Sequence, residues 1–271
     1  LQRTRLAEYE RLVAKENAAS NEDAAVIQIA PGPHLGDQVI EFKNITKGYD
    51  GNTLIKNLEF SLPRAAVVGV IGPNGAGKTT LFKMILGQEK PDSGTVVVGP
   101  TVKASYVDQD RESLGGEKSI VEELAGGADT IMVGKREVPV RQYLSRFGFK
   151  GADQQKPTKQ LSGGERNRAN LAKLLKDGGN VLLLDEPTND LDVNTLRLLE
   201  ESINAFSGCA LIISHDRFFL NRVCTHLLVF EGDGKVRWYE GSYEEYEEWR
   251  KKELGTKLFE NRRAKYRKIV R

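Results

Sequence analysis

Residues 72–80 read GPNGAGKTT and directly follow the apolar run AAVVGVI, and this join decides the fold. The stretch contains the spacing G-x-x-x-x-G-K-[ST], which marks a phosphate-binding loop when a strand precedes it and a helix follows. The Val-rich run is typical of a strand buried on both faces, and KTTLFKMILGQ after the glycines has helical spacing. The sequence therefore predicts a nucleotide-binding loop made of Gly72, Pro73, Asn74, Gly75, Ala76, Gly77, Lys78, Thr79 and Thr80.

The residue types of this loop suit a nucleotide phosphate chain. Glycines let the backbone turn tightly so that successive N–H groups point inward, and the helix N-terminus adds the positive end of its dipole. Lys78 supplies a point charge for the phosphate oxygens, and Thr79 offers a hydroxyl to Mg²⁺. A glycine-rich turn that only links a strand to a helix is the alternative, and the presence of both Lys78 and Thr79 argues against it.

Two carboxylates end a second apolar run, VLLLDEP at residues 181–187. Ligands of parallel α/β sheets bind at the carboxyl ends of the strands, so both acids are expected at the edge that carries the glycine loop. Asp185 is predicted to hold Mg²⁺, directly or through water. Glu186 is predicted to orient and deprotonate the attacking water as a general base. Strand-end acids also serve as helix caps, but an Asp-Glu pair beside a glycine loop makes that the weaker alternative.

A Ser-Gly-Gly segment opens a basic helix in LSGGERNR at residues 161–168. Such a helix N-terminus is a second anion-binding element, and it has no role in a one-site interpretation. Alone, SGG before a helix is a weak signal, most often an N-cap with a flexible approach. In the company of the glycine loop it indicates that the chain carries two half-sites.

Length and composition indicate a folded globular protein. The chain has 271 residues, 39% of them hydrophobic, enough for one large or two small domains. No stretch approaches the roughly 20 apolar residues of a membrane-spanning helix, and the polar N-terminus does not have a signal-peptide pattern, so no membrane partner is expected. Cys209 and Cys224 lie beside apolar residues and are expected to be buried reduced thiols, which fits a cytoplasmic protein.

Charge is concentrated at one end of the sequence. The net charge is only +2, but residues 255–271 carry seven Lys and Arg against one Glu. Residues 242–271 are therefore predicted to form a charged C-terminal helix with a basic tail, which either binds phosphates or only solubilises the chain. At the other end the chain begins with Leu and a charged helical stretch, and residues 1–36 are predicted to finish a linker of a longer protein.

Alternating patterns predict the architecture of the remainder. VIEFKNITKGY and TLIKNLEFSL flank the turn YDGN and are expected as an antiparallel β layer. Apolar strands then alternate with helical segments, which indicates a mainly parallel core sheet with helices on both faces. A polar, Gly-punctuated middle extends from about residue 110 to residue 160. The predicted fold class is α/β, with a mainly parallel core sheet, an antiparallel β layer and a small helical subdomain, and with one glycine loop and one nucleotide-binding unit.

The motifs GPNGAGKTT, LSGGE, LLLDEPT and IISHD, in that order, resemble the ATP-binding cassette superfamily over residues 37–241. The resemblance implies a P-loop ATPase with ATP and Mg²⁺ as ligands. In that superfamily two cassettes pack head to tail, and each ATP lies between the glycine loop of one and the signature sequence of the other. The residues implied to serve the partner's ATP are Ser162, Gly163, Gly164 and Glu165.

The same resemblance implies four further site residues. Tyr49 matches the aromatic residue that stacks on adenine, although a strand Tyr is more often packing surface. Gln109 matches the glutamine that reaches Mg²⁺ and the attacking water. Asp192 matches the loop that crosses to the other cassette. His215 matches the switch histidine that contacts the γ-phosphate, which rests on its IISHD context because a lone His after a strand is usually structural.

Three classes of cassette protein remain possible: a translation factor, the ATPase subunit of a membrane transporter, and a DNA-repair or chromosome cassette. DEPTNDLD and SHDRFFL resemble the ABC-F group, whereas transporter subunits more commonly have Ser and Ala before LD and Thr before HD. Repair and chromosome cassettes usually insert zinc modules or long coiled coils, whose patterns are not found here. The discriminating residues are Asn189, Ser214, Arg217, Phe218 and Phe219.

Within ABC-F, PGPHLGDQVIEF, the glycine-loop region and the YRKIVR end resemble the energy-dependent translational throttle subgroup. This implies the C-terminal cassette of a two-cassette protein that binds the ribosomal exit site, contacts rRNA and tRNA, and gates elongation by the ATP to ADP ratio. The expected partners are the ribosome and the first cassette of the same protein, with a head-to-tail homodimer as a further possibility. The transporter subunit stays the alternative.

Overall fold

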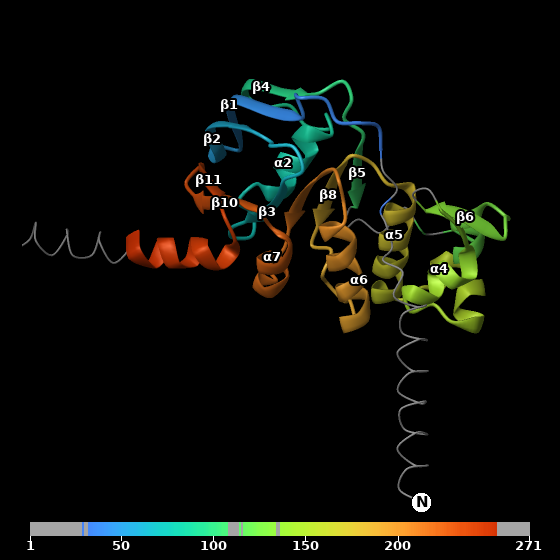
Figure 1. Ribbon diagram of the computed structural model, residues 1–271. Helices are drawn as coiled ribbons and strands as arrows, with labels where there is room; N and C mark the ends of the chain where they lie inside the picture. The colour runs from blue at the N-terminus through green and yellow to red at the C-terminus, as the bar shows by residue number, and fades with distance from the viewer. Residues whose placement is uncertain (1–28, 30–31, 108–113, 115, 134–135, 254–271) are drawn as a thin grey trace, which may run out of the picture.

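The computed structural model describes residues 29, 32–107, 114, 116–133 and 136–253. It shows a three-stranded sheet at the top of Figure 1, a six-stranded sheet below it, and a helical part to one side. The elements are β1 (Ile40–Tyr49), β2 (Asn52–Ser61), β3 (Val67–Ile71), α2 (Lys78–Ile85), β4 (Ser93–Val98), β5 (Ala104–Val107), α3 (Ile120–Ala125), β6 (Thr130–Val133), β7 (Arg136–Pro139), α4 (Val140–Arg146), η2 (Gly151–Gln155), η3 (Thr158–Gln160), α5 (Gly163–Asp177), β8 (Val181–Asp185), α6 (Val193–Asn204), β9 (Cys209–Ile213), α7 (Arg217–Val223), β10 (His226–Gly232) and β11 (Lys235–Glu240).

The six-stranded sheet has the order β11-β10-β3-β9-β8-β5. The pairs from β10 to β5 are parallel, and only β11 is antiparallel, as the second strand of a hairpin. Strands β8 and β9 are buried along their whole length, as expected of parallel strands covered on both faces. The prediction of a mainly parallel core sheet is confirmed.

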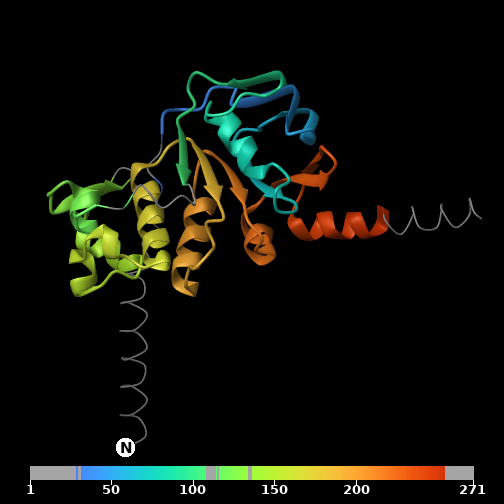
Figure 2. The same cartoon turned by 180° about the vertical axis from the view of Figure 1, so that it is seen from behind.

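Each central strand sends alternate side chains into two different cores. In β8, Leu182 and Leu184 join the core formed with α5, α6 and α7, whereas Val181 and Leu183 join the core formed with α2. Figures 1 and 2 show α2 between the two sheets and the other three helices on the opposite face. This arrangement fixes the carboxyl ends of β3, β8 and β9 side by side.

The three-stranded sheet β2-β1-β4 is antiparallel throughout, so the predicted antiparallel layer is also confirmed. Phe42 stacks on Phe60 with a centroid distance of 4.7 Å, and Phe60 stacks on Trp238 at 5.2 Å. Because Trp238 belongs to β11, this aromatic row joins the antiparallel layer to the core sheet.

The helical part contains α3, α4, η2 and η3 and a two-stranded sheet, β6-β7. Tyr143 in α4 is fully buried, and its hydroxyl donates to the Ala172 carbonyl at 2.7 Å, which fastens this part to α5. The hairpin was not predicted, because strands of four residues are too short to show a period of two.

Residues 1–28 and 254–271, which include most of the predicted linker and the basic tail, lie outside the described part of the chain. A helix over residues 243–253 packs on the cassette through Tyr246, which is 3% exposed. Within the residues that the structure describes, no helix is long and apolar enough to span a membrane. Cys209 and Cys224 are both buried and free.

Candidate functional site

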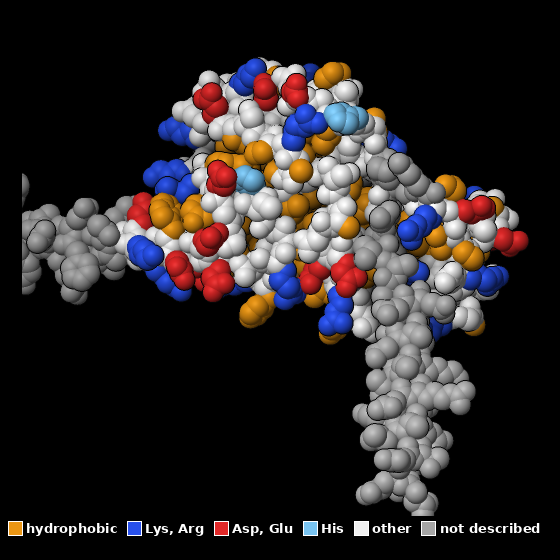
Figure 3. Space-filling view, viewed as in Figure 1, with side chains coloured by type: hydrophobic (Ala, Val, Ile, Leu, Met, Phe, Trp, Pro, Cys, Tyr) orange, Lys and Arg blue, Asp and Glu red, His pale blue; other side chains and the backbone are white. Residues whose placement is uncertain are grey.

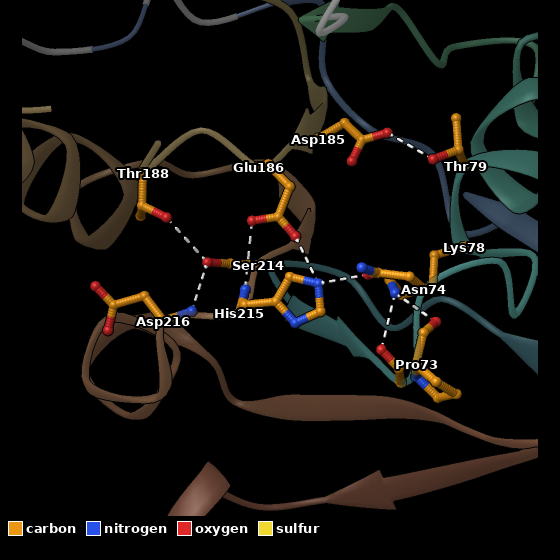
Figure 4. A network of polar contacts seen from close by, with 11 residues as sticks. Pro73, Asn74, Lys78, Thr79, Asp185, Glu186, Thr188, Ser214, His215 and Asp216 are labelled. Carbon is orange, nitrogen blue, oxygen red and sulfur yellow. Dashed lines mark hydrogen bonds and ion pairs between the residues drawn. The ribbon is translucent and has the colours of Figure 1, made fainter. Parts of the chain in front are cut away.

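A cavity of about 640 Å³ opens at the carboxyl ends of β3, β8 and β9. The connections that follow these parallel strands meet at one edge of the sheet, which is where α/β proteins bind ligands. Figure 4 shows the polar network at this edge. The cavity is lined by Tyr49, Leu54, Asn74, Gly75, Gly77, Lys78, Thr79, Thr80, Asp185, Glu186, Asn189, Ile213 and His215.

The predicted glycine loop joins β3 to α2. The Lys78 ammonium donates to the carbonyls of Gly72 at 2.8 Å and Pro73 at 2.9 Å, so the loop holds its own cation beside the cavity (Figure 4). Burial lowers the pKa of Lys78, and the charges of Glu186 and Asp185 oppose that shift. Ala76 does not line the cavity but packs on the core under the loop.

Two glycines of the loop have structural reasons of their own. Gly72 has a φ of 149°, and a Cβ there would lie 2.6 Å from Phe230 Cβ, so a larger residue would displace β10. Gly77 is the N-cap of α2 with a φ of 103°, in the left-handed region, and no side chain caps this helix. The first N–H groups of α2 therefore remain for a ligand.

Thr79 and Asp185 provide a pair of oxygen atoms at the same edge. The Thr79 hydroxyl donates to Asp185 Oδ2 at 2.8 Å, and Asp185 is 7% exposed. Mg²⁺ is usually bound by one or two carboxylate or hydroxyl oxygens together with substrate phosphates, and this donor set fits that chemistry. The structure thus brings together two of the residues predicted to hold Mg²⁺, and the magnesium position itself stays a prediction.

Glu186 has an unusual backbone and an unusual environment. Its φ is 49°, a left-handed conformation that costs free energy in a residue other than glycine and that concentrates at functional sites. Burial raises the pKa of Glu186, and the nearby charge of His215 opposes the rise. A carboxylate with a raised pKa is a stronger base once ionised, as proton abstraction from water requires.

His215 connects Glu186 to the glycine loop. Its Nε2 lies 3.4 Å from Glu186 Oε1 and 3.1 Å from Asn74 Oδ1, with the donor set by the ring tautomer (Figure 4). The His215 N–H points to Glu186 Oε2 at 3.4 Å. Next to it, the Ser214 hydroxyl accepts from the Asp216 N–H at 3.0 Å and lies 3.1 Å from Thr188 Oγ1. The segments after β8 and β9 are thereby tied together.

The signature residues lie elsewhere. None of Ser162, Gly163, Gly164 and Glu165 lines the cavity. Ser162 is exposed and is the N-cap of α5, in a capping box with Glu165. Asp192 is the N-cap of α6 and accepts from the N–H groups of Asn194 and Thr195, both at 3.0 Å. Gln109 lies outside the described residues, so its predicted position is not seen.

Sequence reasoning missed Leu54 as a cavity residue. Leu54 occupies β2 and lines the cavity beside Gly77, and a Cβ on Gly77 would lie 3.0 Å from Leu54 Cβ. One Leu in an alternating strand carries no signal that could have identified it.

Comparison with known proteins agrees with this geometry. The sequence profile described as ABC transporter matches residues 55–189, which include the glycine loop, the signature segment and the Asp-Glu pair. The chain belongs to the ABC ATPase family. A solved structure with this fold, cbiO1 from Clostridium perfringens, part of the ABC transporter complex cbiONQ, has a TM-score of 0.59 and 26% identity, covering 82% of this chain and 95% of that one. The predicted cassette fold is confirmed.

Curated relatives indicate a subgroup of the ABC ATPase family to which the chain is similar. It is 52% identical over 269 residues to the energy-dependent translational throttle protein EttA of Escherichia coli K12, and 55% identical over 273 residues to the protein of that name in Mycobacterium tuberculosis H37Rv. Each alignment covers 99% of this chain, but 48% and 49% of the relatives. The chain thus spans about half the length of these relatives, and its resemblance to the ABC-F throttle subgroup is confirmed.

Proposed function

We propose that this cassette binds Mg-ATP in the 640 Å³ cavity and hydrolyses it. The observation that carries the proposal is the convergence of four side chains on one cavity from three separate segments of the chain, namely Lys78, the pair Asp185 and Glu186, and His215. Phosphoryl transfer is catalysed mainly by positioning and by stabilising charge, and these four side chains provide both.

Each residue has a role in the proposed reaction. The N–H groups of the glycine loop and Lys78 bind the phosphates. Thr79 and Asp185, with Gln109, hold Mg²⁺, which neutralises charge on the phosphate oxygens when bound. Glu186 takes the proton of the attacking water, and His215 contacts the γ-phosphate and keeps Glu186 in place at 3.4 Å. Tyr49 stacks on the adenine.

The active unit is proposed to be a head-to-tail pair of cassettes. Ser162, Gly163, Gly164 and Glu165 lie outside the cavity of their own chain, and Asp192 begins a helix that follows the Asp-Glu pair. A second cassette would bring its own Ser-Gly-Gly segment to this cavity and take this one for its own ATP. The partner is the first cassette of the full-length protein, with a second copy of this chain as the alternative.

The larger role we propose is that of the second cassette of a cytoplasmic ABC-F translation factor. Support comes from 52–55% identity, over nearly the whole chain, to proteins named energy-dependent translational throttles. On this proposal residues 1–36 end the inter-cassette linker, residues 37–241 form the cassette, and residues 242–271 form the C-terminal helix and basic tail. The full-length factor binds the ribosomal exit site, contacts rRNA and tRNA, and gates elongation by the ATP to ADP ratio.

Charge on the described surface is mixed. In Figure 3 the Lys and Arg side chains on this face are interspersed with Asp and Glu rather than gathered into one patch. The segment with seven Lys and Arg, residues 255–271, lies outside the described residues. A phosphate-binding role for the tail therefore stays a proposal from the sequence.

The test is co-sedimentation of the full-length protein with ribosomes in the presence of ATP, ADP or no nucleotide. We expect the protein to pellet with ribosomes in ATP and to be released in ADP. The transporter alternative predicts instead that the protein stays in the supernatant and co-purifies with a membrane protein. Co-sedimentation that is the same in all three conditions would contradict gating by nucleotide.

A further inference from the structure

A buried lysine lies beneath the aromatic side chain at the cavity rim. Lys47 in β1 is 6% exposed, and its ammonium is 4.8 Å from the centroid of the Tyr49 ring. The same nitrogen contacts Glu89 Oε1 at 2.9 Å and Asp92 Oδ1 at 3.2 Å. Lysines are rarely buried unless their charge is paired, and two carboxylates pair this one. These hydrogen bonds raise the pKa of Lys47, so the ammonium stays charged at neutral pH.

This cluster restrains Tyr49 through its ring and through the neighbouring backbone. The Lys47 ammonium covers one face of the ring. The backbone N–H of the neighbouring Gly48 donates to Asp92 Oδ2 at 2.8 Å. Tyr49 is nevertheless 43% exposed and lines the 640 Å³ cavity. The part of the ring that the cluster leaves uncovered is therefore presented to the cavity.

The cluster also joins the ring to the phosphate loop. Glu89 and Asp92 lie in the connection between β4 and α2, the helix that begins with Lys78. The Glu89 N–H donates to the Lys83 carbonyl of α2 at 3.2 Å, and the Asp92 N–H donates to the Thr46 carbonyl of β1 at 2.9 Å. The chain that leaves α2 therefore contains Glu89 and Asp92, so the phosphate loop and the residues around the Tyr49 ring are joined through one helix.

We propose that Lys47 is a positioning residue for the nucleobase: with Glu89 and Asp92 it holds Tyr49 where the base stacks, at a fixed place relative to the phosphate loop. This inference rests on the proposed ATP site. Stacking on an aromatic ring stabilises a bound base, and a ring that is already ordered loses less conformational entropy on binding. A cation against one face of the ring adds to that ordering.

The experiment measures binding of ATP and of inorganic tripolyphosphate to the 271-residue chain. Tripolyphosphate reports on the phosphate loop alone, and ATP reports on the loop and the base. Lys47→Met should weaken ATP binding about tenfold and leave tripolyphosphate binding unchanged. Lys47→Arg, which keeps the charge, should recover most of the ATP affinity. In a Tyr49→Ala background Lys47→Met should have no further effect, because the ring it positions is gone.

Lys43→Met is the matched control. Lys43 is on the same strand and pairs with Glu41 at 3.0 Å, but its side chain is 58% exposed, so neither ligand's affinity should change. Should Lys47→Met fail to fold, Glu89→Gln weakens the cluster while Asp92 still pairs Lys47, and should weaken ATP binding about threefold without affecting tripolyphosphate.

The outcomes separate the two proposals. Wild-type protein that binds neither ligand overturns the proposed function and the inference with it. Wild-type protein that binds both, with Lys47→Met binding ATP as tightly, overturns the role of Lys47 alone. Equal losses of ATP and tripolyphosphate affinity in Lys47→Met would mean that Lys47 acts through the fold, and would also overturn it.

Discussion

Two of the described helices, α2 and α5, begin at segments that the sequence predicts to bind phosphate, and their N-termini are built differently. At the start of α2 the N-cap is Gly77, no side chain caps the helix, and the first turn has no acidic residue. At the start of α5 the Ser162 hydroxyl accepts from the Glu165 N–H at 3.3 Å, and Glu165 Oε2 accepts from the Ser162 N–H at 2.8 Å. One terminus is open to a ligand, and the other satisfies its own groups.

This difference suits the glycine loop and the Ser-Gly-Gly segment to different roles in binding phosphate. An open helix N-terminus beside a lysine binds an anion without help. The N-terminus of α5 carries Glu165 in its first turn, and its capping box already occupies the N–H groups of Ser162 and Glu165. Alone it is therefore a poor anion-binding site. In the proposed head-to-tail pair, it would add contacts to phosphates that the other cassette's glycine loop already binds.

The largest expected effect concerns the cavity at the start of α2, which Glu186 also lines. Glu186→Gln keeps the shape of the side chain and removes the basicity of the proposed general base. In the 271-residue chain ATP affinity should be nearly unchanged, while in the full-length protein hydrolysis at this site should slow about 100-fold or more. Acid quenching and nucleotide quantification after one round should find about one unhydrolysed ATP per molecule. Complete hydrolysis at the wild-type rate would remove Glu186 from its role.

The cavity residues around the uncapped start of α2 were easier to predict from the sequence than the contacts of Lys47. The glycine-loop, Asp-Glu and His motifs each follow an apolar run, and parallel strands bring such positions to one edge, so their meeting follows from pattern alone. Lys47, Glu89 and Asp92 could not be found this way, because their contacts join segments 42 and 45 residues apart with no shared period. The β6-β7 hairpin was missed because its strands are short, and the roles of the site residues stay predictions.

A smaller effect tests the α5 half. Ser162→Ala should slow hydrolysis about tenfold at the site formed with the other cassette's glycine loop, because a hydrogen-bond donor to the phosphates is lost. ATP affinity of the 271-residue chain should not change, since Ser162 does not line its cavity. The measurement is the same quench assay on the full-length protein.

Ser119→Ala provides the control for that test. Ser119 caps α3 in a box of the same form, with Glu122 Oε2 accepting its N–H at 2.8 Å, but it is 5% exposed. Both substitutions should cost about 1 kcal/mol of stability, as loss of a Ser N-cap does. Only Ser162→Ala should affect hydrolysis. Equal slowing by both would show that capping, not contact with ATP, explains the result.

The smallest expected effect is on the pH dependence of stability, to which the start of α5 contributes through Glu165. The hydrogen bond from the Ser162 N–H lowers the pKa of Glu165 from 4.5 and is the largest cause of the shift. The side chains of Ser162 and Lys156 lower this pKa further, whereas burial raises it. A lowered folded-state pKa gives stability that is present above the unfolded value of 4.5 and is lost as pH falls through the folded value. Glu165→Gln should therefore be less stable than wild type at neutral pH, by less than about 1 kcal/mol.

That gap should close as pH falls below 4.5, because the wild-type carboxylate then takes up a proton and loses its advantage over the amide. Urea unfolding of both chains at several pH values measures it. Glu122→Gln in α3 should behave alike, since the Ser119 N–H lowers the pKa of Glu122 in the same way. The start of α2 has no acid to titrate, which is the difference between the two termini. A gap for Glu165→Gln that stays constant with pH would mean that its charge does not stabilise α5.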